Sequence, residues 1–286
     1  MVKVCIIYDK VRFEEKSLYD KAKKKGLVTE IIDAKTITIN NTSKRTTLQL
    51  CDVVLQRCIS HFRGLYLTAC LEFMGFVVIN KFKVGETCGN KLITSLTLAK
   101  SNVPTPKTHF AFSAESAIEV INTTGFPVVL KPITGSWGRG VFPLRNEEVA
   151  NMVIEMREDK DSPLSRIYYI QEMIKRPPRD LRCIVVGDKI VAAIYRYSTE
   201  NEWRTNVSRG GKVELAPVTN ELEDIVLRAA KAVGGGILGV DLMEDEKRGL
   251  LVHEVNNTVE FRGASNVSES DIAGAMIDYA LTMAKK

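Results

Sequence analysis

The sequence has no hydrophobic run long enough to cross a membrane. A transmembrane helix needs roughly 18 or more consecutive apolar residues, and no segment of the 286-residue chain has that character. The chain begins with a short apolar segment, Met1 to Ile7, which is typical of a buried strand and lacks the cleavage site of a signal peptide. We therefore expect a soluble, cytoplasmic protein without a membrane partner.

Cysteine and histidine are too few and too scattered for a structural metal centre. The six cysteines form no C-x-x-C pair, and the chain has three histidines. Most of the cysteines lie among apolar residues, which is typical of small buried thiols rather than of a disulfide framework or a metal cluster. We expect neither a structural zinc site nor disulfide bonds.

Two common nucleotide-binding signatures and the pattern of a nucleic-acid platform are also missing. The first strand is not followed by G-x-G-x-x-G, and no glycine-rich segment ends in the Lys-Ser or Lys-Thr of a P-loop. Basic and aromatic residues do not alternate as they do where single-stranded nucleic acid stacks. We expect no nucleic-acid partner and no dinucleotide site after the first strand.

The positive charge is concentrated in the amino-terminal third of the chain. Of the 40 basic and 35 acidic residues, 15 and 9 lie within residues 1–90, and the net charge is +5. A basic domain attracts an acidic protein or an anionic small molecule. The lysine-rich run from Lys21 to Lys25 is equally typical of a solvated helix face.

The hydrophobic pattern predicts an α/β protein of two or three subdomains, for which 45% hydrophobic residues provide a sizeable core. Residues 2–8, 27–32, 53–55 and 77–79 are typical of strands, and residues 14–25 and 64–74 of helices between them. The alternation of strand and helix predicts an open parallel sheet. We place the boundaries at residues 1–90, 91–180 and 181–286.

The second and third units show their own elements. Residues 89–101 and 113–122, the latter capped by Ser113, are predicted helices, and residues 126–131 form a strand. Gly187-Asp188 predicts a hairpin turn, residues 221–233 a helix, and two strands are expected to end near Asp241 and Asn256. A capping box at Ser268 to Asp271 predicts the start of the last helix.

Three polar residues near these two strands are the most informative. Glu254 and Asn256 are two apart and point to the same face of a strand, and Asp241 ends the preceding strand. Two carboxylates and an amide oxygen on one face suit Mg²⁺ shared with phosphate oxygens. A solvated strand face is the alternative, but the neighbouring valines indicate partial burial, where charge requires a partner.

Lys131 ends a buried strand just before the glycine-rich segment Gly135-Ser136-Trp137-Gly138-Arg139-Gly140-Val141. Glycines let backbone N–H groups approach an anion closely, so this segment is a candidate phosphate-binding loop. On its own it is equally typical of a flexible turn.

Further polar residues follow along the chain. The segment Gln171-Glu172-Met173-Ile174 leaves an apolar strand and can offer backbone groups and an apolar wall to an adenine ring; an ordinary edge strand is the alternative. Asp180, Arg182, Arg196, Arg204, Asn206 and Arg209 follow. Arginines bind carboxylates and phosphates through paired N–H groups, so together these residues favour an anionic substrate.

The order of these motifs over essentially the whole chain resembles the ATP-grasp ligases. The resemblance rests on Asn90-Lys91, Lys131 with the glycine-rich loop, Gln171-Glu172, Asp180-Leu181-Arg182, Arg204-Thr205-Asn206, Gly239-Val240-Asp241 and Glu254-Val255-Asn256. It is closest to the RimK branch, whose members add glutamate to a ribosomal protein. The implied fold is an ATP-grasp fold behind an amino-terminal pre-ATP-grasp domain.

Within that branch, Glu260-Phe261-Arg262-Gly263-Ala264 resembles the LysX and ArgX ligases, which attach an amino acid to the small acidic carrier protein LysW. In the 2-aminoadipate enzymes Glu-Phe-Lys is followed by Asn, so Gly263-Ala264 favours glutamate, as in ArgX. The resemblance implies ATP and Mg²⁺, two ions being expected, and a homo-oligomer, either dimer or tetramer.

The resemblance also implies roles for individual residues. Lys91, Lys131 and Arg196 are expected to be catalytic. The expected nucleotide contacts are Lys91, Lys131, Gly135 to Val141, Gln171 to Ile174, Asp180, Arg182 and Asn206. The expected substrate contacts are Arg196, Val207, Ser208, Glu260, Phe261, Arg262, Gly263 and Ala264, and the metal ligands are Asp241, Glu254 and Asn256.

Three other interpretations stay open. The amino acid could be 2-aminoadipate, the acceptor could be a ribosomal protein or another peptide, or the chain could be a nucleotide-binding regulatory module without catalysis. The complete set Asp241, Glu254 and Asn256 disfavours the last.

Overall fold

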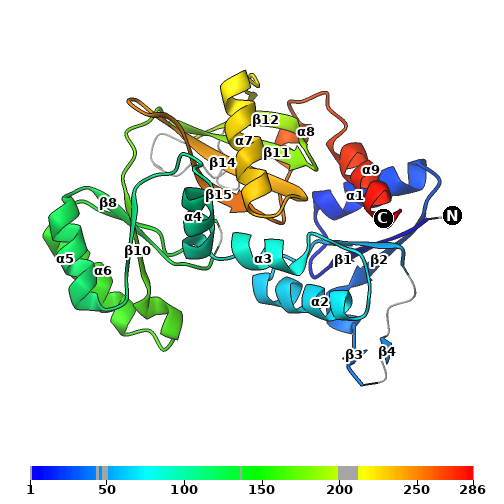
Figure 1. Ribbon diagram of the computed structural model, residues 1–286, viewed down its shortest axis with the longest axis horizontal. Helices are drawn as coiled ribbons and strands as arrows, with labels where there is room; N and C mark the ends of the chain where they lie inside the picture. The colour runs from blue at the N-terminus through cyan, green and yellow to red at the C-terminus, as the bar shows by residue number, and fades with distance from the viewer. Residues whose placement is uncertain (1, 43–44, 47–50, 136, 199–211, 286) are drawn as a thin grey trace.

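The computed structural model describes residues 2–42, 45–46, 51–135, 137–198 and 212–285. It is built on three main sheets, with both termini near the same end of the molecule (Figure 1). No helix within the described residues is long and apolar enough to cross a membrane.

The amino-terminal sheet is parallel, as predicted, with strand order β2-β1-β5-β6. Its elements are β1 (Lys3–Tyr8), α1 (Phe13–Lys24), β2 (Val28–Asp33), β5 (Val53–Gln56), α2 (His61–Phe73) and β6 (Val78–Ile79), with η1 (Ala34–Thr36), β3 (Ile39–Asn40) and β4 (Arg45–Thr46) between β2 and β5. β1 and β5 lie side by side. The chain passes from β1 to β2 on one side and from β5 to β6 on the other, so the strand order reverses between β1 and β5. In such sheets ligands bind beyond the carboxyl ends of the strands at this switch point.

The predicted helix at 89–101 is preceded by a helix that the sequence did not indicate. α3 (Phe82–Cys88) ends at Gly89, and α4 (Lys91–Lys100) starts after Asn90, whose side chain accepts hydrogen bonds from the N–H groups of Leu92 and Ile93. The cap therefore fixes Lys91 as the first residue of α4, and such caps contribute about 1 kcal/mol each.

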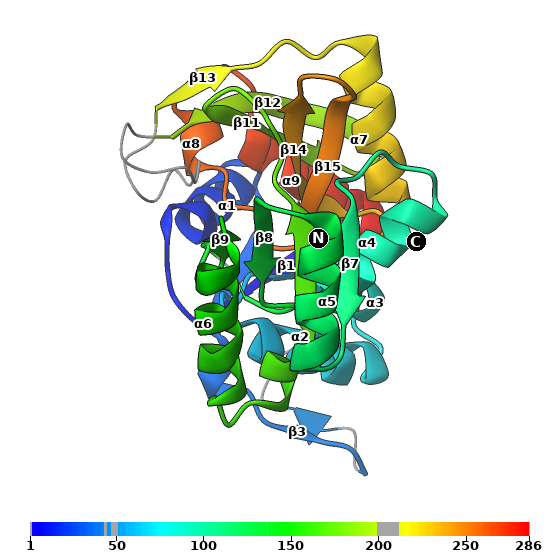
Figure 2. The same ribbon diagram turned by 90° about the vertical axis from the view of Figure 1, so that its left-hand side faces the viewer.

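The central sheet is antiparallel, in the order β7-β10-β8-β9. Helices α5 and α6 lie together on one of its faces (Figure 2). Its elements are β7 (Thr108–Ala111), α5 (Ala114–Thr124), β8 (Val128–Lys131), β9 (Phe142–Leu144), α6 (Glu147–Glu158), η2 (Pro163–Arg166) and β10 (Tyr168–Glu172). The predicted cap is confirmed, because Ser113 accepts a hydrogen bond from the N–H of Ser116.

The third sheet has the order β13-β12-β11-β14-β15 and is also antiparallel. Its elements are β11 (Arg179–Val186), β12 (Lys189–Tyr197), β13 (Val213–Leu215), α7 (Asn220–Ala232), β14 (Ile237–Asp245), β15 (Gly249–Asn256), α8 (Arg262–Ser265) and α9 (Ile272–Ala284). The turn at Gly187-Asp188 joins β11 to β12, which confirms the predicted hairpin. Asp241 lies in the middle of β14 and not at its end, because the hairpin continues to Asp245.

Two local predictions were wrong. The last helix is capped by Asp271, whose side chain accepts from the N–H of Gly274, and not by a capping box starting at Ser268. Cys5 and Cys51 form a disulfide although neither lies in a cysteine motif. The parallel neighbours β1 and β5 bring the two residues together across a sequence separation of 46, which no local pattern reveals.

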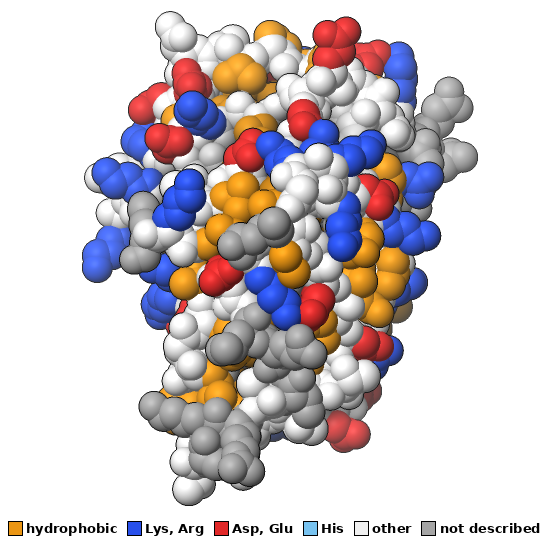
Figure 3. Space-filling model, turned by 90° about the vertical axis from the view of Figure 1, so that its right-hand side faces the viewer, with side chains coloured by type: hydrophobic (Ala, Val, Ile, Leu, Met, Phe, Trp, Pro, Cys, Tyr) orange, Lys and Arg blue, Asp and Glu red, His pale blue; other side chains and the backbone are white. Residues whose placement is uncertain are grey.

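The lysine-rich helix α1 packs on the last helix, α9. Lys21 pairs with Asp271 at 2.7 Å and Lys25 with Asp278 at 2.8 Å, whereas Lys23 and Lys24 are exposed. Figure 3 shows basic side chains scattered over this end of the molecule with acidic ones between them. Part of the positive charge of the amino-terminal domain is thus matched within the chain.

Candidate active site

A cavity of about 490 Å³ lies where the three sheets approach one another. Its lining comes from all three parts of the chain. We call the part around Lys91, Lys131, Asp241 and Glu254 the charged end. The part lined by Gln56, Cys58 and Thr68 of the amino-terminal domain is the amide end. His61, from the same domain, lies near Lys91, because burial and that ammonium lower the pKa of its imidazole.

The charged end is built on neighbouring strands of the third sheet. Asp241 on β14 is paired in register with Glu254 on β15, and Asn256 lies two residues further along the same strand. Arg182 on β11 donates to Asp241 through Nε (2.8 Å) and Nη2 (2.7 Å). The predicted convergence of Asp241, Glu254 and Asn256 is therefore present, and an arginine fork orients the first of them.

Arg196 on β12 extends this network. Its guanidinium donates to both carboxylate oxygens of Asp180, at 2.7 and 2.8 Å, and Nη2 lies 3.1 Å from Oδ2 of Asp241. Arg196, Asp180 and Asp241 are all at least 96% buried. Arg182 and Arg196 together match the charges of Asp180 and Asp241, so the buried carboxylates are compensated and held in place by paired hydrogen bonds.

These surroundings keep both carboxylates ionised. Burial alone would raise the pKa of Asp241, but Arg182 and Arg196 hold it below its ordinary value. For Glu254 burial also acts to raise the pKa, and Lys91 lowers it below the ordinary value. Ionised oxygens are what a hard cation requires.

Two lysines face the carboxylates. Lys91 Nζ lies 2.9 Å from Glu254 Oε1 and donates to the carbonyl oxygen of Gly135 at 2.9 Å. Lys131 is 8% exposed and donates to Gln171 Oε1 at 2.6 Å. Burial lowers the pKa of Lys131 to about 8. An ammonium group so poorly compensated by the protein is suited to bind an anionic ligand.

The glycine-rich loop covers the charged end. Gly135, Trp137, Gly138, Arg139 and Val141 line the cavity, and the guanidinium of Arg139 lies 5.3 Å from the centre of the Trp137 ring. Gly135, Gly138 and Gly140 have positive φ angles of 135°, 67° and 69°. The loop therefore adopts a backbone that depends on glycine. Ser136 lies outside the described residues.

The segment 171–174 supports the charged end from outside the cavity. The Gln171 amide accepts from Lys131 and donates to Thr108 and Tyr169. Glu172 accepts from the backbone N–H of Lys107 and from Arg248. None of Gln171, Glu172, Met173 or Ile174 lines the cavity, so their contact with an adenine ring stays a prediction.

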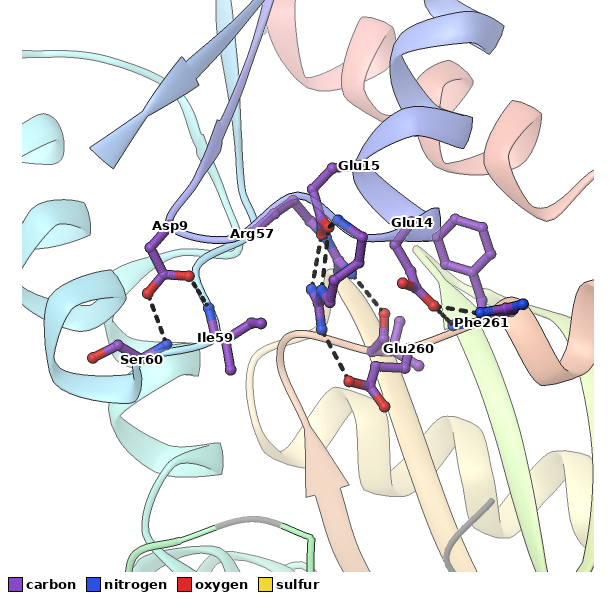
Figure 4. A network of polar contacts seen from close by, with 11 residues as sticks. Asp9, Glu14, Glu15, Arg57, Ile59, Ser60, Glu260 and Phe261 are labelled. Carbon is purple, nitrogen blue, oxygen red and sulfur yellow. Dashed lines mark hydrogen bonds and ion pairs between the residues drawn. The ribbon is translucent and has the colours of Figure 1, made fainter. Parts of the chain in front are cut away.

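The segment after β15 is attached to the amino-terminal domain, as Figure 4 shows. Arg12 donates to Glu15 and to Glu260, and Arg57 donates to the carbonyl oxygen of Val259 at 2.9 Å. Glu14 accepts from the N–H groups of Phe261 and Arg262, both at 3.1 Å. These bonds fix the position of residues 259–262 from the amino-terminal side.

Of the predicted substrate residues in this segment, Glu260 alone lines the cavity. Phe261 and Ala264 are each 1% exposed and pack in the core with α9. The structure thus does not bring Phe261, Arg262, Gly263 or Ala264 to the cavity wall. Asn206, Val207 and Ser208, with Arg204 and Arg209, lie outside the described residues.

Several lining residues were missed by the sequence interpretation: Arg12, Gln56, His61, Asn80 and His253. Gln56 and Asn80 directly follow buried residues at the carboxyl ends of parallel strands β5 and β6, which is the position where such sheets bind ligands. The sequence could therefore have indicated Gln56 and Asn80 as candidates for the site. His253 was missed because a β-bulge opposite Asp241 and Leu242 interrupts the alternation of side chains along β15. Strand alternation therefore did not predict the face on which His253 lies.

The residues at the charged end fit Mg²⁺. Two ionised carboxylates and an amide form the oxygen-rich set that this ion prefers. Asp241, Glu254 and Asn256 are the residues that would hold the ion.

Comparison with known proteins agrees with this geometry. Residues 4–87 match the LysX preATP-grasp domain, and residues 88–280 match the RimK-like ATP-grasp domain. The chain is similar to the alpha-aminoadipate–LysW ligase LysX of Saccharolobus solfataricus, with 37% identity, covering 96% of this chain and 99% of that protein. It is 31% identical to the glutamate–LysW ligase ArgX of Sulfolobus acidocaldarius, covering 97% and 98%.

Solved structures show the same fold. A RimK domain ATP-grasp protein from Sphaerobacter thermophilus superposes with a TM-score of 0.79 at 21% identity, covering 98% of this chain and 100% of that one. The ATP-grasp ligase PsnB, solved with Mg and ADP, superposes with a TM-score of 0.74 at 17% identity, covering 98% of each chain.

The fold and the site therefore define an ATP-dependent ligase of the ATP-grasp class. More narrowly, the chain belongs to the RimK-like ATP-grasp family, in the branch that contains LysX and ArgX.

Proposed function

We propose that this enzyme joins the α-amino group of glutamate to the γ-carboxylate of the carboxyl-terminal glutamate of the carrier protein LysW, in arginine biosynthesis. The supporting observation in the structure is one cavity lined both by a lysine–carboxylate cluster and by polar groups of the amino-terminal domain. The choice of carrier is supported by the similarity to two LysW ligases along nearly the whole chain.

The proposed reaction has two chemical steps. ATP phosphorylates the carrier's carboxylate and releases ADP, and the amine of glutamate then attacks the acyl phosphate and displaces inorganic phosphate. The site residues bind and orient charge rather than form covalent bonds. When bound at Asp241, Glu254 and Asn256, Mg²⁺ would offset the negative charge of the phosphate oxygens.

Lys91 and Lys131 supply the positive charge of the protein at the charged end. Lys91 is placed by the start of α4 and Lys131 by the end of β8, and both line the cavity. Their ammonium groups stabilise charge on the phosphoryl group as it moves. The glycine-rich loop excludes water, which would otherwise hydrolyse the acyl phosphate. Arg196 acts as a positioning residue, since its contacts are to Asp180 and Asp241.

The alternative amino acid is 2-aminoadipate, and a specific observation favours it. The identity to LysX is 37%, against 31% to ArgX. The sequence Glu260-Phe261-Arg262-Gly263-Ala264 favours glutamate instead. Because Ala264 is buried away from the cavity, this motif would act through the position of Glu260 rather than by touching the substrate.

Mass spectrometry of the carrier tests the proposal directly. LysW is incubated with enzyme, ATP, Mg²⁺ and an equimolar mixture of glutamate and 2-aminoadipate. We expect the mass increase of one glutamyl residue. An increase of one aminoadipyl residue would establish the alternative, and an unmodified carrier together with a modified ribosomal protein would refute both.

A further inference from the structure

The amide end of the cavity contains a buried polar side chain that the charged end does not use. Gln56 is the last residue of β5 and is 7% exposed. Its side chain lines the cavity, and no described residue forms a hydrogen bond with its amide. The amide is not among the fully enclosed polar atoms that lack a partner, so it is accessible from the cavity and can donate a hydrogen bond to a ligand there.

Two glycines next to the cavity leave room for polar side chains on its wall. A Cβ atom at Gly64 in α2 would lie 1.8 Å from Gln56 Nε2, so a larger residue at position 64 would displace the amide. A Cβ atom at Gly89 would similarly lie 1.8 Å from His61 Cε1. Two glycines thus admit two polar side chains to the same wall of the cavity.

We infer that Gln56 binds the side-chain carboxylate of the amino-acid substrate and sets its permitted length. This inference rests on the proposed function. The α-amino group is the nucleophile and must lie near the phosphate, at the charged end. The side chain of the amino acid then extends from there toward Gln56, along the wall that the amino-terminal domain contributes.

The burial of the residues at the amide end favours the free amino acid, rather than the carrier protein, as the ligand bound there. Cys58, Thr68 and Gln56 are at least 93% buried. A small free molecule can be enclosed there, whereas the end of a chain attached to a folded protein requires an open approach. The neutral amide donates hydrogen bonds to a carboxylate without the charge that would also bind phosphate.

Glu260 supplies the complementary charge for the other group. Its Oε1 accepts from Arg12, and its side chain is 38% exposed. A carboxylate on the cavity wall attracts the ammonium form in which an amino acid arrives, before the deprotonated amine reacts beside the phosphate at the charged end. Gln56 and Glu260 together define a site for an acidic α-amino acid, with the distal carboxylate at Gln56.

Three variants test the role of Gln56. Gln56→Glu places like charge against the substrate, and we expect amino-acid affinity to fall about 100-fold with ATP affinity unchanged. Gln56→Asn retracts the amide by one methylene, and we expect the preference for 2-aminoadipate over glutamate to rise about tenfold. Gly64→Ala keeps the glutamine but displaces its amide, and should weaken amino-acid binding without lowering thermal stability.

Calorimetric titration of each amino acid into enzyme containing ADP and Mg²⁺ measures affinity without the carrier. Asn151→Asp, the same amide-to-acid change at an exposed position of α6, serves as the control. The inference is overturned if Gln56→Glu binds both amino acids as the wild type does, if Gln56→Asn weakens both equally, or if the wild type binds neither. If binding responds as expected but LysW is not modified, the proposed carrier is wrong and the role of Gln56 stands.

Discussion

At the charged end of the cavity the ionised side chains hold one another in place, whereas at the amide end Gln56 has no partner among the described residues. The first arrangement keeps its geometry before any substrate arrives. The second leaves hydrogen-bonding capacity for a ligand. The contrast suggests that the chemistry of the phosphate is common to the fold, while the choice of amino acid is made by a few side chains at the amide end.

The sharpest test of the charged end is Glu254→Gln. The change removes a metal ligand and the partner of Lys91, and we expect kcat to fall about 10³-fold, comparable to the loss of a strong electrostatic contact in other active sites. ADP release in the presence of carrier and amino acid measures it. Glu155→Gln, on the exposed surface of α6, is the matched control. Full activity in Glu254→Gln would refute the metal assignment.

Lys131→Met separates catalysis from stability at the same end. Because burial disfavours the Lys131 ammonium, the apolar replacement should leave the free energy of unfolding unchanged or higher at pH 7, while kcat falls about 10²-fold. Denaturant unfolding and ADP release provide the two readouts. A clear loss of stability with normal turnover would show that Lys131 is structural.

Arg12→Ala tests the attachment of residues 259–262 to the amino-terminal domain. The change leaves the buried Glu15 with Arg57 alone and releases Glu260, so we expect a loss of about 2 kcal/mol in unfolding free energy. We also expect a higher KM for the amino acid, because Glu260 is no longer held. Arg63→Ala removes the ion pair of a half-exposed arginine with Asp9 and should change stability less, because Asp9 keeps its hydrogen bonds from the N–H groups of Ile59 and Ser60.

The lowered pKa of Lys131 predicts a pH dependence of nucleotide binding. The protonated form binds phosphate, and its fraction falls as the pH rises through about 8. We therefore expect ATP affinity to fall up to tenfold between pH 7 and pH 9. Titrations at constant ionic strength check this, and the same series on Lys131→Met should be flat. Constant wild-type affinity up to pH 10 would contradict the assignment.

The smallest expected effect is on the rate at which LysW associates with the enzyme near the lysine-rich helix α1. Lys23 and Lys24 are exposed, whereas Lys21 and Lys25 already pair with α9. Replacing Lys23 and Lys24 by glutamine should slow association with LysW only a few-fold and weaken its salt dependence. The matched double variant of Lys21 and Lys25 should act mainly on stability. An unchanged association rate in the first variant would place the carrier elsewhere.

The two ends of the cavity also differ in how well the sequence predicts them. Glu254 and Asn256 could be placed on one face because strand alternation is a local rule, and Lys131 because it ends an apolar strand. Gln56 ends an equally clear strand, so its position was predictable, but the room for its amide depends on Gly64, which only the folded chain brings near. The disulfide of Cys5 and Cys51 and the bulge at His253 escaped for the same reason. The role of Gln171 in supporting Lys131 also depends on the pairing of β8 with β10, which strand alternation alone does not reveal.

The packing of α1 against α9 has a consequence for synthesis of the chain on the ribosome. The core that contains Val4, Leu18 and Leu55 also contains Met276, Ile277 and Ala280. The amino-terminal domain is therefore translated well before α9, the helix that completes its core. Until then its apolar side chains are open to chaperones and proteases. A ribosome stalled shortly before α9 would display an unfinished first domain, however completely the middle of the chain had folded.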